Sequence, residues 1–134
     1  MIDRNTLFHL GKDSGYVPYT VYMATKDYIA SNPEIIQKFT NATYKGQLWV
    51  NSHTPKEIAE VIAPQFTESD IETLTKIIDR YQSQDTWKEN PIFEEESLTL
   101  IEDIMEEGGE LENCVPYDKY INNDFAKKAI ETIK

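Results

Sequence analysis

The densest group of ionisable side chains is an acidic run near the C-terminal third of the chain. It holds nine carboxylates and no lysine or arginine: Glu94, Glu95, Glu96, Glu102, Asp103, Glu106, Glu107, Glu110 and Glu112. Such a run could bind a divalent cation or supply a general acid and a general base. Its spacing matches no calcium loop, because the glycines follow the run instead of lying inside a ligand loop. We therefore expect a solvated helix face, the usual setting of a helical charge run.

The histidines and the cysteine are isolated from other reactive groups. His9 lies in a polar N-terminal segment, His53 comes just before an expected helix cap, and neither has a second ligand at metal spacing. Cys114 has no basic sequence neighbour that would lower its pKa, so we expect no nucleophile there. The chain has no G-x-S-x-G, phosphate-loop or dinucleotide motif. The sequence thus predicts no catalytic residue, no metal ligand and no cofactor, and we expect a protein that is not an enzyme.

Three tyrosines, Tyr16, Tyr19 and Tyr22, gather where a segment with Gly15 and Pro18 enters an expected strand. An aromatic ring there could stack on a flat ligand while its hydroxyl donates a hydrogen bond. Side chains alternate along a strand, so all three rings cannot line one surface. We take Tyr16 and Tyr19 as the candidate ligand-binding residues. Packing in a core or on a sheet is the alternative for each of them.

One strand and about five helices would position these groups. Tyr19–Ala24 is dense in β-branched and aromatic residues and follows a proline, which predicts a strand. A single strand cannot pair its own backbone groups, so it requires partner strands from elsewhere. Residues 1–18 show no periodicity and are expected to be loop, with a short extended piece at Thr6–Leu10.

The first two helices are indicated by their N-termini. Asn32 followed by Pro33 is typical of an N-cap with proline at the first helical position. Thr54 and Glu57 form a capping box for the second helix. Apolar or small residues of the first helix recur on one stripe: Ile35, Phe39, Ala42, Gly46 and Trp49.

Three further helices follow from the same kinds of signal. Thr67 or Ser69 is expected to cap the third, and Glu95–Glu107 is expected to be the fourth, stopping at Gly108-Gly109. The fifth begins at about Asn123, with an apolar side formed by Phe125, Ala129, Ile130 and Ile133. A helical chain with a solitary strand is typical of part of an α/β layer.

Composition limits the class of partner. The 134 residues carry a formal net charge of −11 and a pI near 4.5. That balance argues against a nucleic-acid partner, because phosphate binding needs clustered lysine and arginine. A single cysteine excludes an internal disulfide. The chain opens on polar residues without an export signal, so we expect it to be cytoplasmic as expressed unless it has been trimmed, and no apolar run is long enough to cross a bilayer.

Three stretches of the chain, taken in order, resemble a known family. They are GYVPYTVYMATKDYIASNPEIIQKFTNAT (residues 15–43), QDTWKENPIFEEESLTLIEDIMEEGGEL (84–111) and VPYDKYINNDFAKKA (115–129). Together they are similar to the C-terminal portion of the NMT1/THI5-like group of solute-binding proteins, which serve ABC importers. The likeness comes from the ordered series, since no single motif in it is specific.

The resemblance implies an α/β parent fold, the periplasmic binding protein-like type II fold, with two lobes that close on a small ligand. Residues 1–18 would be a loop near the hinge, and 19–134 would be the C-terminal part of the first lobe, a single compact unit. The ligand would be a thiamine-pyrimidine precursor, an alkanesulfonate or nitrate, delivered to an ABC permease. Such parents are exported, often as lipoproteins, so the full-length protein would be extracytoplasmic and membrane-anchored.

The chain departs from that family because it is short and has neither the export signal nor most of the second lobe. Helices whose apolar stripes normally cover a central sheet would be exposed, so the chain is expected to self-associate. Two alternatives remain open. One is a free-standing helical protein-interaction module, and the other is an acidic metal-dependent hydrolase, which would require a stoichiometric metal.

Overall fold

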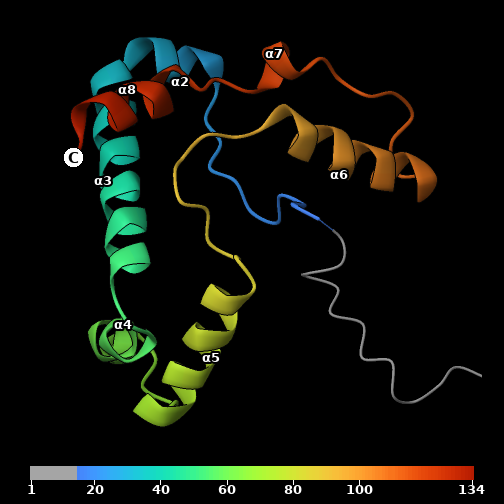
Figure 1. Cartoon of the computed structure of the whole chain (residues 1–134). Helices are drawn as coiled ribbons and strands as arrows, with labels where there is room; N and C mark the ends of the chain where they lie inside the picture. The colour runs from blue at the N-terminus through green and yellow to red at the C-terminus, as the bar shows by residue number, and fades with distance from the viewer. Residues whose placement is uncertain (1–14) are drawn as a thin grey trace, which may run out of the picture. The chain divides into compact units, whose positions relative to one another are not determined.

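The computed structural model describes residues 15–134, and all regular structure in that range is helical (Figure 1). The elements in chain order are α2 (Lys26–Ser31), α3 (Pro33–Ser52), α4 (Pro55–Ile62), the 3₁₀ turn η1 (Ala63–Gln65), α5 (Ile71–Ser83), α6 (Glu95–Glu107), α7 (Tyr117–Tyr120) and α8 (Asp124–Thr132). Among these elements no helix has both the length and the apolar character needed to span a membrane.

The predicted α/β fold with a strand at Tyr19–Ala24 is wrong for the described part of the chain. These residues form neither strand nor helix, and the side chains of Tyr19 and Met23 are 96% and 88% exposed. The β-propensity of such residues reflects how well they fit a pleated, half-buried surface, which must be supplied by neighbouring strands. Residues 15–134 supply no neighbouring strand. The extended piece expected at Thr6–Leu10 lies outside the described residues.

The capping box predicted for α4 is confirmed. Thr54 Oγ1 accepts a hydrogen bond from Glu57 N at 3.3 Å, and Thr54 N donates to Glu57 Oε2 at 2.8 Å. Thr54 Oγ1 also donates to Glu57 Oε2, at 2.7 Å, and the two hydrogen bonds that Thr54 N and Thr54 Oγ1 donate to this carboxylate hold the pKa of Glu57 below its ordinary value, because they favour the ionised form. The start of α4 is therefore encoded by these two residues.

The starts of α3 and α5 differ from the prediction in their capping side chains. Asn32 is the N-cap residue of α3 and Pro33 is its first residue, as predicted, but the Asn32 side chain makes no capping bond and instead donates to a carbonyl of α2 at 3.1 Å. At α5 the cap is Asp70, whose Oδ1 accepts from Thr73 N at 2.7 Å, and not the earlier threonine or serine.

The chain folds into two compact units. The larger consists of Ala24–Ile92 with Asn123–Lys134. At one end of this unit α4 packs against α5, and the side chains between them are nearly inaccessible: Ile58, Ala59, Leu74 and Ile78. At the other end α8 lies across α3 (Figure 1), and Ala126 and Ala129 of α8 are buried.

Side-chain amides join distant parts of the larger unit. Gln37 Nε2 donates to Phe125 O at 2.9 Å, a bond that links α3 to α8 across 88 positions of sequence. Gln82 Nε2 donates to Val50 O at 3.1 Å and to His53 O at 3.2 Å, which attaches α5 to the C-terminal end of α3. Both amides thereby satisfy or share backbone carbonyls near helix ends.

The smaller unit consists of Phe93–Asn122 together with the segment that ends at Met23, and it contains α6 and α7. The predicted stop of α6 is confirmed, since Gly109 follows it with a φ of 74°, a conformation that favours glycine. Gly15 has a φ of 75°, and a Cβ at this position would lie 3.2 Å from Leu100 Cδ2 of α6. The assignment of 1–18 to a hinge loop and of 19–134 to one lobe stays a prediction.

Candidate functional site

The candidate ligand-binding tyrosines lie in the non-helical segment before α2. Tyr16 is 58% exposed and Tyr19 is 96% exposed. Neither tyrosine lines the depression along α6 or the one between α3 and α8. Both side chains are exposed, and a ligand held there would need a second wall. The structure therefore leaves their role as ligand-binding residues a prediction.

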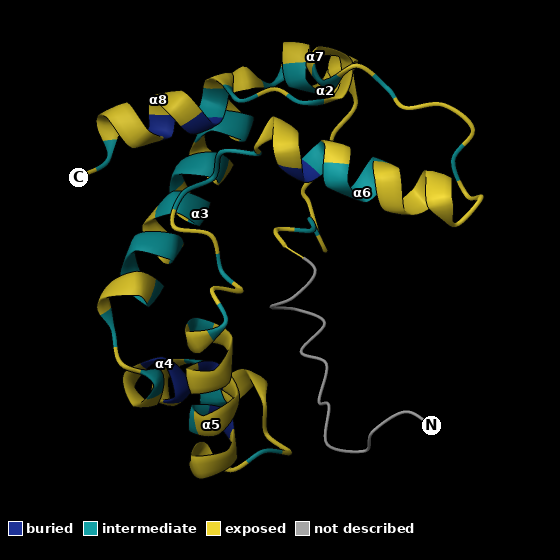
Figure 2. Ribbon diagram, turned by 45° about the vertical axis from the view of Figure 1, so that its right-hand side comes forward, coloured by how far each residue is buried: buried dark blue, intermediate teal, exposed yellow. Residues whose placement is uncertain are grey.

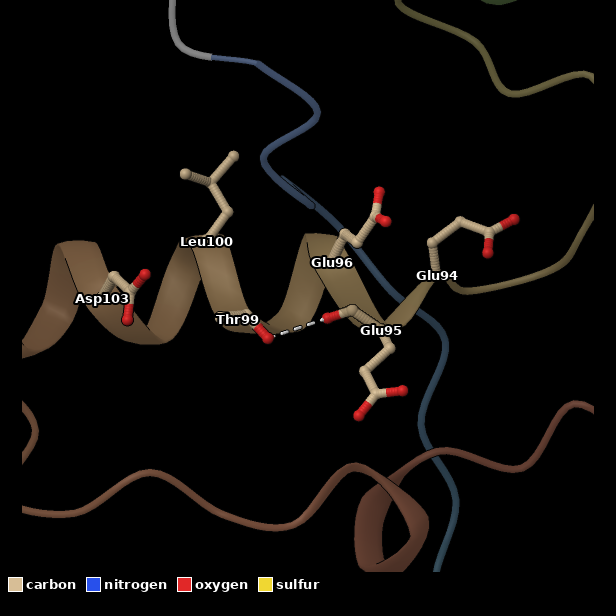
Figure 3. Close-up of a pocket in the computed structure, with 6 residues that line it drawn as sticks. All are labelled: Glu94, Glu95, Glu96, Thr99, Leu100 and Asp103. Atoms are coloured by element: carbon tan, nitrogen blue, oxygen red, sulfur yellow. Dashed lines mark hydrogen bonds between the residues drawn. The ribbon is translucent and has the colours of Figure 1, made fainter.

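A depression of about 620 Å³ lies along the N-terminal half of α6, where the acidic run begins (Figure 3). Its lining consists of Glu94, Glu95, Glu96, Thr99, Leu100 and Asp103. Their side chains point in different directions from the helix, and the hydrogen bond drawn among them, from Thr99 Oγ1 to Glu95 O at 3.2 Å, is internal to α6. Carboxylates without a neighbouring cation repel an anion, so this surface does not suit nitrate or a sulfonate.

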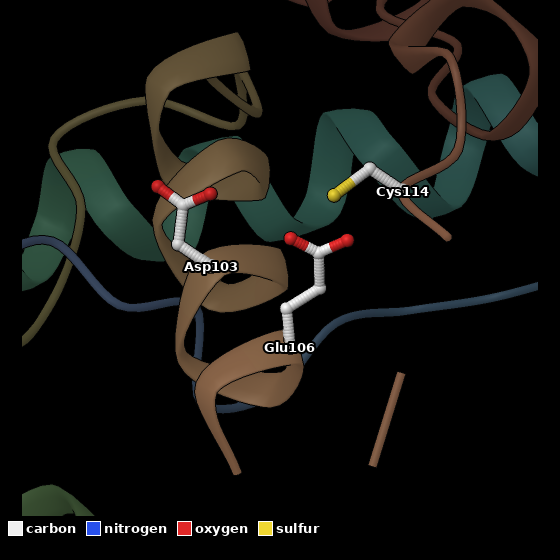
Figure 4. A group of neighbouring side chains, drawn as sticks. All are labelled: Asp103, Glu106 and Cys114. Atoms are coloured by element: carbon white, nitrogen blue, oxygen red, sulfur yellow. The ribbon is translucent and has the colours of Figure 1, made fainter. Parts of the chain in front are cut away.

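Three side chains converge beside the C-terminal half of α6: Asp103, Glu106 and Cys114 (Figure 4). One ligand atom from each lies within 4.8 Å of the others, and all three residues are exposed. Val115 N donates to Glu102 Oε1 at 2.9 Å, and this bond holds the segment around Cys114 against the helix. The sequence did not place these groups together, because nothing in its spacing shows that the chain returns along α6 after Gly109.

The electrostatics of that cluster do not favour a reactive thiol. Partial desolvation and the nearby carboxylates of Glu106, Glu102 and Asp103 raise the pKa of the Cys114 thiol. The thiolate is the form that attacks electrophiles and binds metals, so a raised pKa weakens both functions near neutral pH. A metal ion at this place would have to displace the thiol proton.

His53 has a structural role at the junction between α3 and α4. Its Nδ1 lies 2.6 Å from Trp49 O, where it can only be the donor, and its ring stacks on the Trp49 indole with centroids 4.2 Å apart. This bond leaves Nε2 as the acceptor of the neutral ring. The Trp49 side chain packs in turn against the buried residues of α4 and α5. The other histidine, His9, lies outside the described residues.

A second depression, of about 360 Å³, lies between α3 and α8 within the larger unit. Its lining consists of Pro33, Glu34, Gln37, Lys38, Phe125 and Lys128. Gln37 crosses it by donating to Phe125 O and to Asn41 Oδ1, at 2.9 and 2.8 Å. The sequence did not indicate this groove, because it depends on contact between helices far apart along the chain. The hydrogen bond from Gln37 to Phe125 O helps to hold α8 on α3.

Comparison with known proteins gives one similarity. No protein-family model matches the chain, and no solved structure matches it. The chain is 36% identical over 118 residues to a protein of Bacillus subtilis (strain 168) named "Putative binding protein YtlA". The aligned region covers 88% of this chain but 35% of that protein, so the chain spans about a third of the length of the curated relative it matches.

This similarity makes the chain a relative of a protein named as a binding protein, and it agrees with the expectation of a solute-binding role at that coarse level. The relative's name gives no substrate and no transporter. The narrower family assignment made from the three sequence stretches stays a prediction.

Proposed function

We propose that the chain is part of the substrate-binding component of an ABC importer and has no enzymatic activity. The observation that carries this proposal is the 36% identity, extending over 88% of the chain, to a protein named as a binding protein. The proposed ligand is a small solute of the thiamine-pyrimidine precursor, alkanesulfonate or nitrate class, and the proposed partner is the importer's permease. The complete protein would work outside the cytoplasm as a membrane-anchored carrier.

The proposed ligand site includes Tyr16 and Tyr19 and is completed by polypeptide beyond these 134 residues. Tyr16 and Tyr19 are exposed and would form one wall for a flat ligand, whereas capture requires a second wall that closes on the ligand. The relative has enough further polypeptide to form that second wall. The aligned region covers 35% of its length, so the other 65% lies outside it. We therefore expect the chain by itself to bind ligand weakly or not at all.

The test is a ligand panel on a hybrid in which this chain replaces the matching 118 residues of the Bacillus subtilis relative. Pyrimidines, alkanesulfonates and nitrate are added in a thermal-shift experiment, with the intact relative measured alongside. A true ligand at about 100 times Kd should stabilise the hybrid by about 2.7 kcal/mol. The proposal would be contradicted if a ligand raised the melting temperature of the intact relative but not that of the folded hybrid.

Tyrosine variants then locate the site. Tyr16→Ala and Tyr19→Ala should weaken binding by roughly tenfold or more, since each base-sized stacking contact contributes about 1–3 kcal/mol. Tyr120→Ala is the matched control, because Tyr120 is also a surface tyrosine, 69% exposed, but lies in α7. Equal affinities for all three variants would remove Tyr16 and Tyr19 from the site while leaving the solute-binding role intact.

The runner-up function is a helical protein-interaction module. It is favoured by the number of large apolar side chains, 17 among the described residues, that are exposed on the surface. Surfaces of this kind are typical of proteins that meet another polypeptide. The hybrid experiment separates the two, because an interaction module would give no ligand-dependent stabilisation.

A further inference from the structure

The groove between α3 and α8 has both of its walls in the larger unit, so its shape is set within one compact unit. Ala126 and Ala129 of α8 are buried, whereas most other residues of this helix are exposed (Figure 2). Gln37 Nε2 of α3 donates to Phe125 O at 2.9 Å and ties the two helices together at the groove. The groove is therefore formed before any ligand binds, as small-molecule sites usually are.

The lining of the groove combines apolar surface with few free polar groups. Phe125 and Pro33 contribute side chains without a polar atom, and the aliphatic stems of the lining lysines add to this surface. The two hydrogens of Gln37 Nε2 are used by Phe125 O and Asn41 Oδ1, at 2.9 and 2.8 Å. The volume of about 360 Å³ lies at the lower end of the range for small-molecule sites, which favours a ligand with one short hydrocarbon tail.

The groove is positively charged although the chain as a whole has a net charge of −11. Its lining has two lysines, Lys38 from α3 and Lys128 from α8, and one carboxylate, Glu34, so its formal charge is +1. Both lysines are exposed, and neither takes part in the two ion pairs found among the described residues, which lie in α4 and α5. The depression along α6 is lined by four carboxylates and no lysine or arginine. Of these two depressions, the α3–α8 groove is the one that favours an anion.

We propose that the α3–α8 groove binds a small amphiphilic anion, a carboxylate that carries a single hydrocarbon tail. The tail contacts Phe125 and Pro33, and the carboxylate pairs with Lys38 and Lys128. An inorganic anion would leave the apolar part of the groove in water, and an uncharged hydrocarbon would leave both lysines without an ion pair. This inference stands apart from the proposed function, because the candidate ligand-binding tyrosines lie in the smaller unit and do not line this groove.

The first test titrates the full chain with octanoate, below the concentration at which it forms micelles, and follows the backbone amides by NMR. The largest shifts should lie at residues 33–38 and 125–128, which line the groove. Affinity should rise from butanoate through hexanoate to octanoate, by up to about fourfold for each methylene group that leaves water. Octanol and octylammonium have the same tail without the negative charge and should bind more weakly. Shifts confined to other residues, or equal affinities for octanoate and octylammonium, would overturn the proposal.

The second test changes the charge of the groove. Lys38→Gln with Lys128→Gln should weaken octanoate binding by about two- to tenfold, because exposed ion pairs are individually weak. Lys127→Gln is the matched control, since Lys127 is also exposed on α8 but does not line the groove. Lys38→Glu with Lys128→Glu should make the protein prefer octylammonium to octanoate, an exchange of preference that a loss of structure would not produce. If the double glutamine variant binds octanoate as tightly as the wild type does, the lysines do not hold the carboxylate and the proposal is wrong.

Discussion

At the scale of single residues, Cys114 shows how folding sets the electrostatic environment of a side chain about which the sequence says little. The sequence indicates only that no basic residue adjoins it, and that is enough to predict an unreactive thiol. The structure adds carboxylates from α6, above all Glu106, that raise its pKa further. Contacts of this kind depend on where the chain turns back, and local spacing does not record that.

Alkylation kinetics test this environment. The Cys114 thiol should react with iodoacetamide at neutral pH several-fold more slowly than a free cysteine, because less of it is thiolate when its pKa is raised. Glu106→Gln removes a negative charge, so the pKa should fall and the rate at a given pH should rise. Glu131→Gln in α8 is the control. A pH profile that does not move in the Glu106 variant would show that this carboxylate does not set the thiol pKa.

At the scale of elements, α4 packs against α5 around a cluster of buried apolar side chains. The buried Leu74 and Ile78 of α5 lie four residues apart, whereas the buried Ile58 and Ala59 of α4 are adjacent, and Thr54 and Asp70 cap the starts of the two helices. Periodicity and caps are local properties, so the sequence predicted both helices and the capping box of α4, although the cap of α5 is Asp70 and not the predicted Thr67 or Ser69. The prediction of a strand at Tyr19–Ala24 was wrong because a strand is not a local property. It exists only where another strand pairs with it.

Two adjacent isoleucines of α5 measure how much this packing stabilises the fold. Ile78 is 2% exposed and Ile77 is 43% exposed, although both have the same side chain. Ile78→Ala should lower the free energy of unfolding by about 2–5 kcal/mol, through lost burial and the cavity left behind. Ile77→Ala should cost less than about 1 kcal/mol. Urea unfolding of both variants checks the difference, and equal losses would contradict the described burial.

At the scale of the whole molecule, the described residues bury few apolar side chains. Six are fully buried, whereas 17 large apolar side chains are exposed. The sequence has enough apolar residues for a core, 40% of the chain, but composition does not reveal which of them find a partner within the same polypeptide. Phe39 and Val61 are among the large apolar side chains exposed on the described helices, whereas the self-association expected from such exposure stays a prediction.

Limited proteolysis tests the described boundary between ordered helices and the segment before them. Chymotrypsin should cut the described residues first after Tyr19 or Tyr22, because both are highly exposed and lie outside any helix. Cuts after Tyr44, which is half-buried within α3, should follow much later. Mass spectrometry of early time points identifies the sites. A first cut at Tyr44 would mean that α3 opens more readily than the segment around Tyr19.

The hydrogen bond from Gln37 to Phe125 has a consequence for the order in which the larger unit forms. The α4–α5 hairpin joins neighbours in sequence and needs only a short loop to close, so it is suited to fold early, while the ribosome is still extending the chain. Docking of α8 on α3 must wait until residues 88 positions later have been synthesised. A nascent chain would therefore carry a bare α3 for several seconds of translation, long enough for a chaperone to engage it.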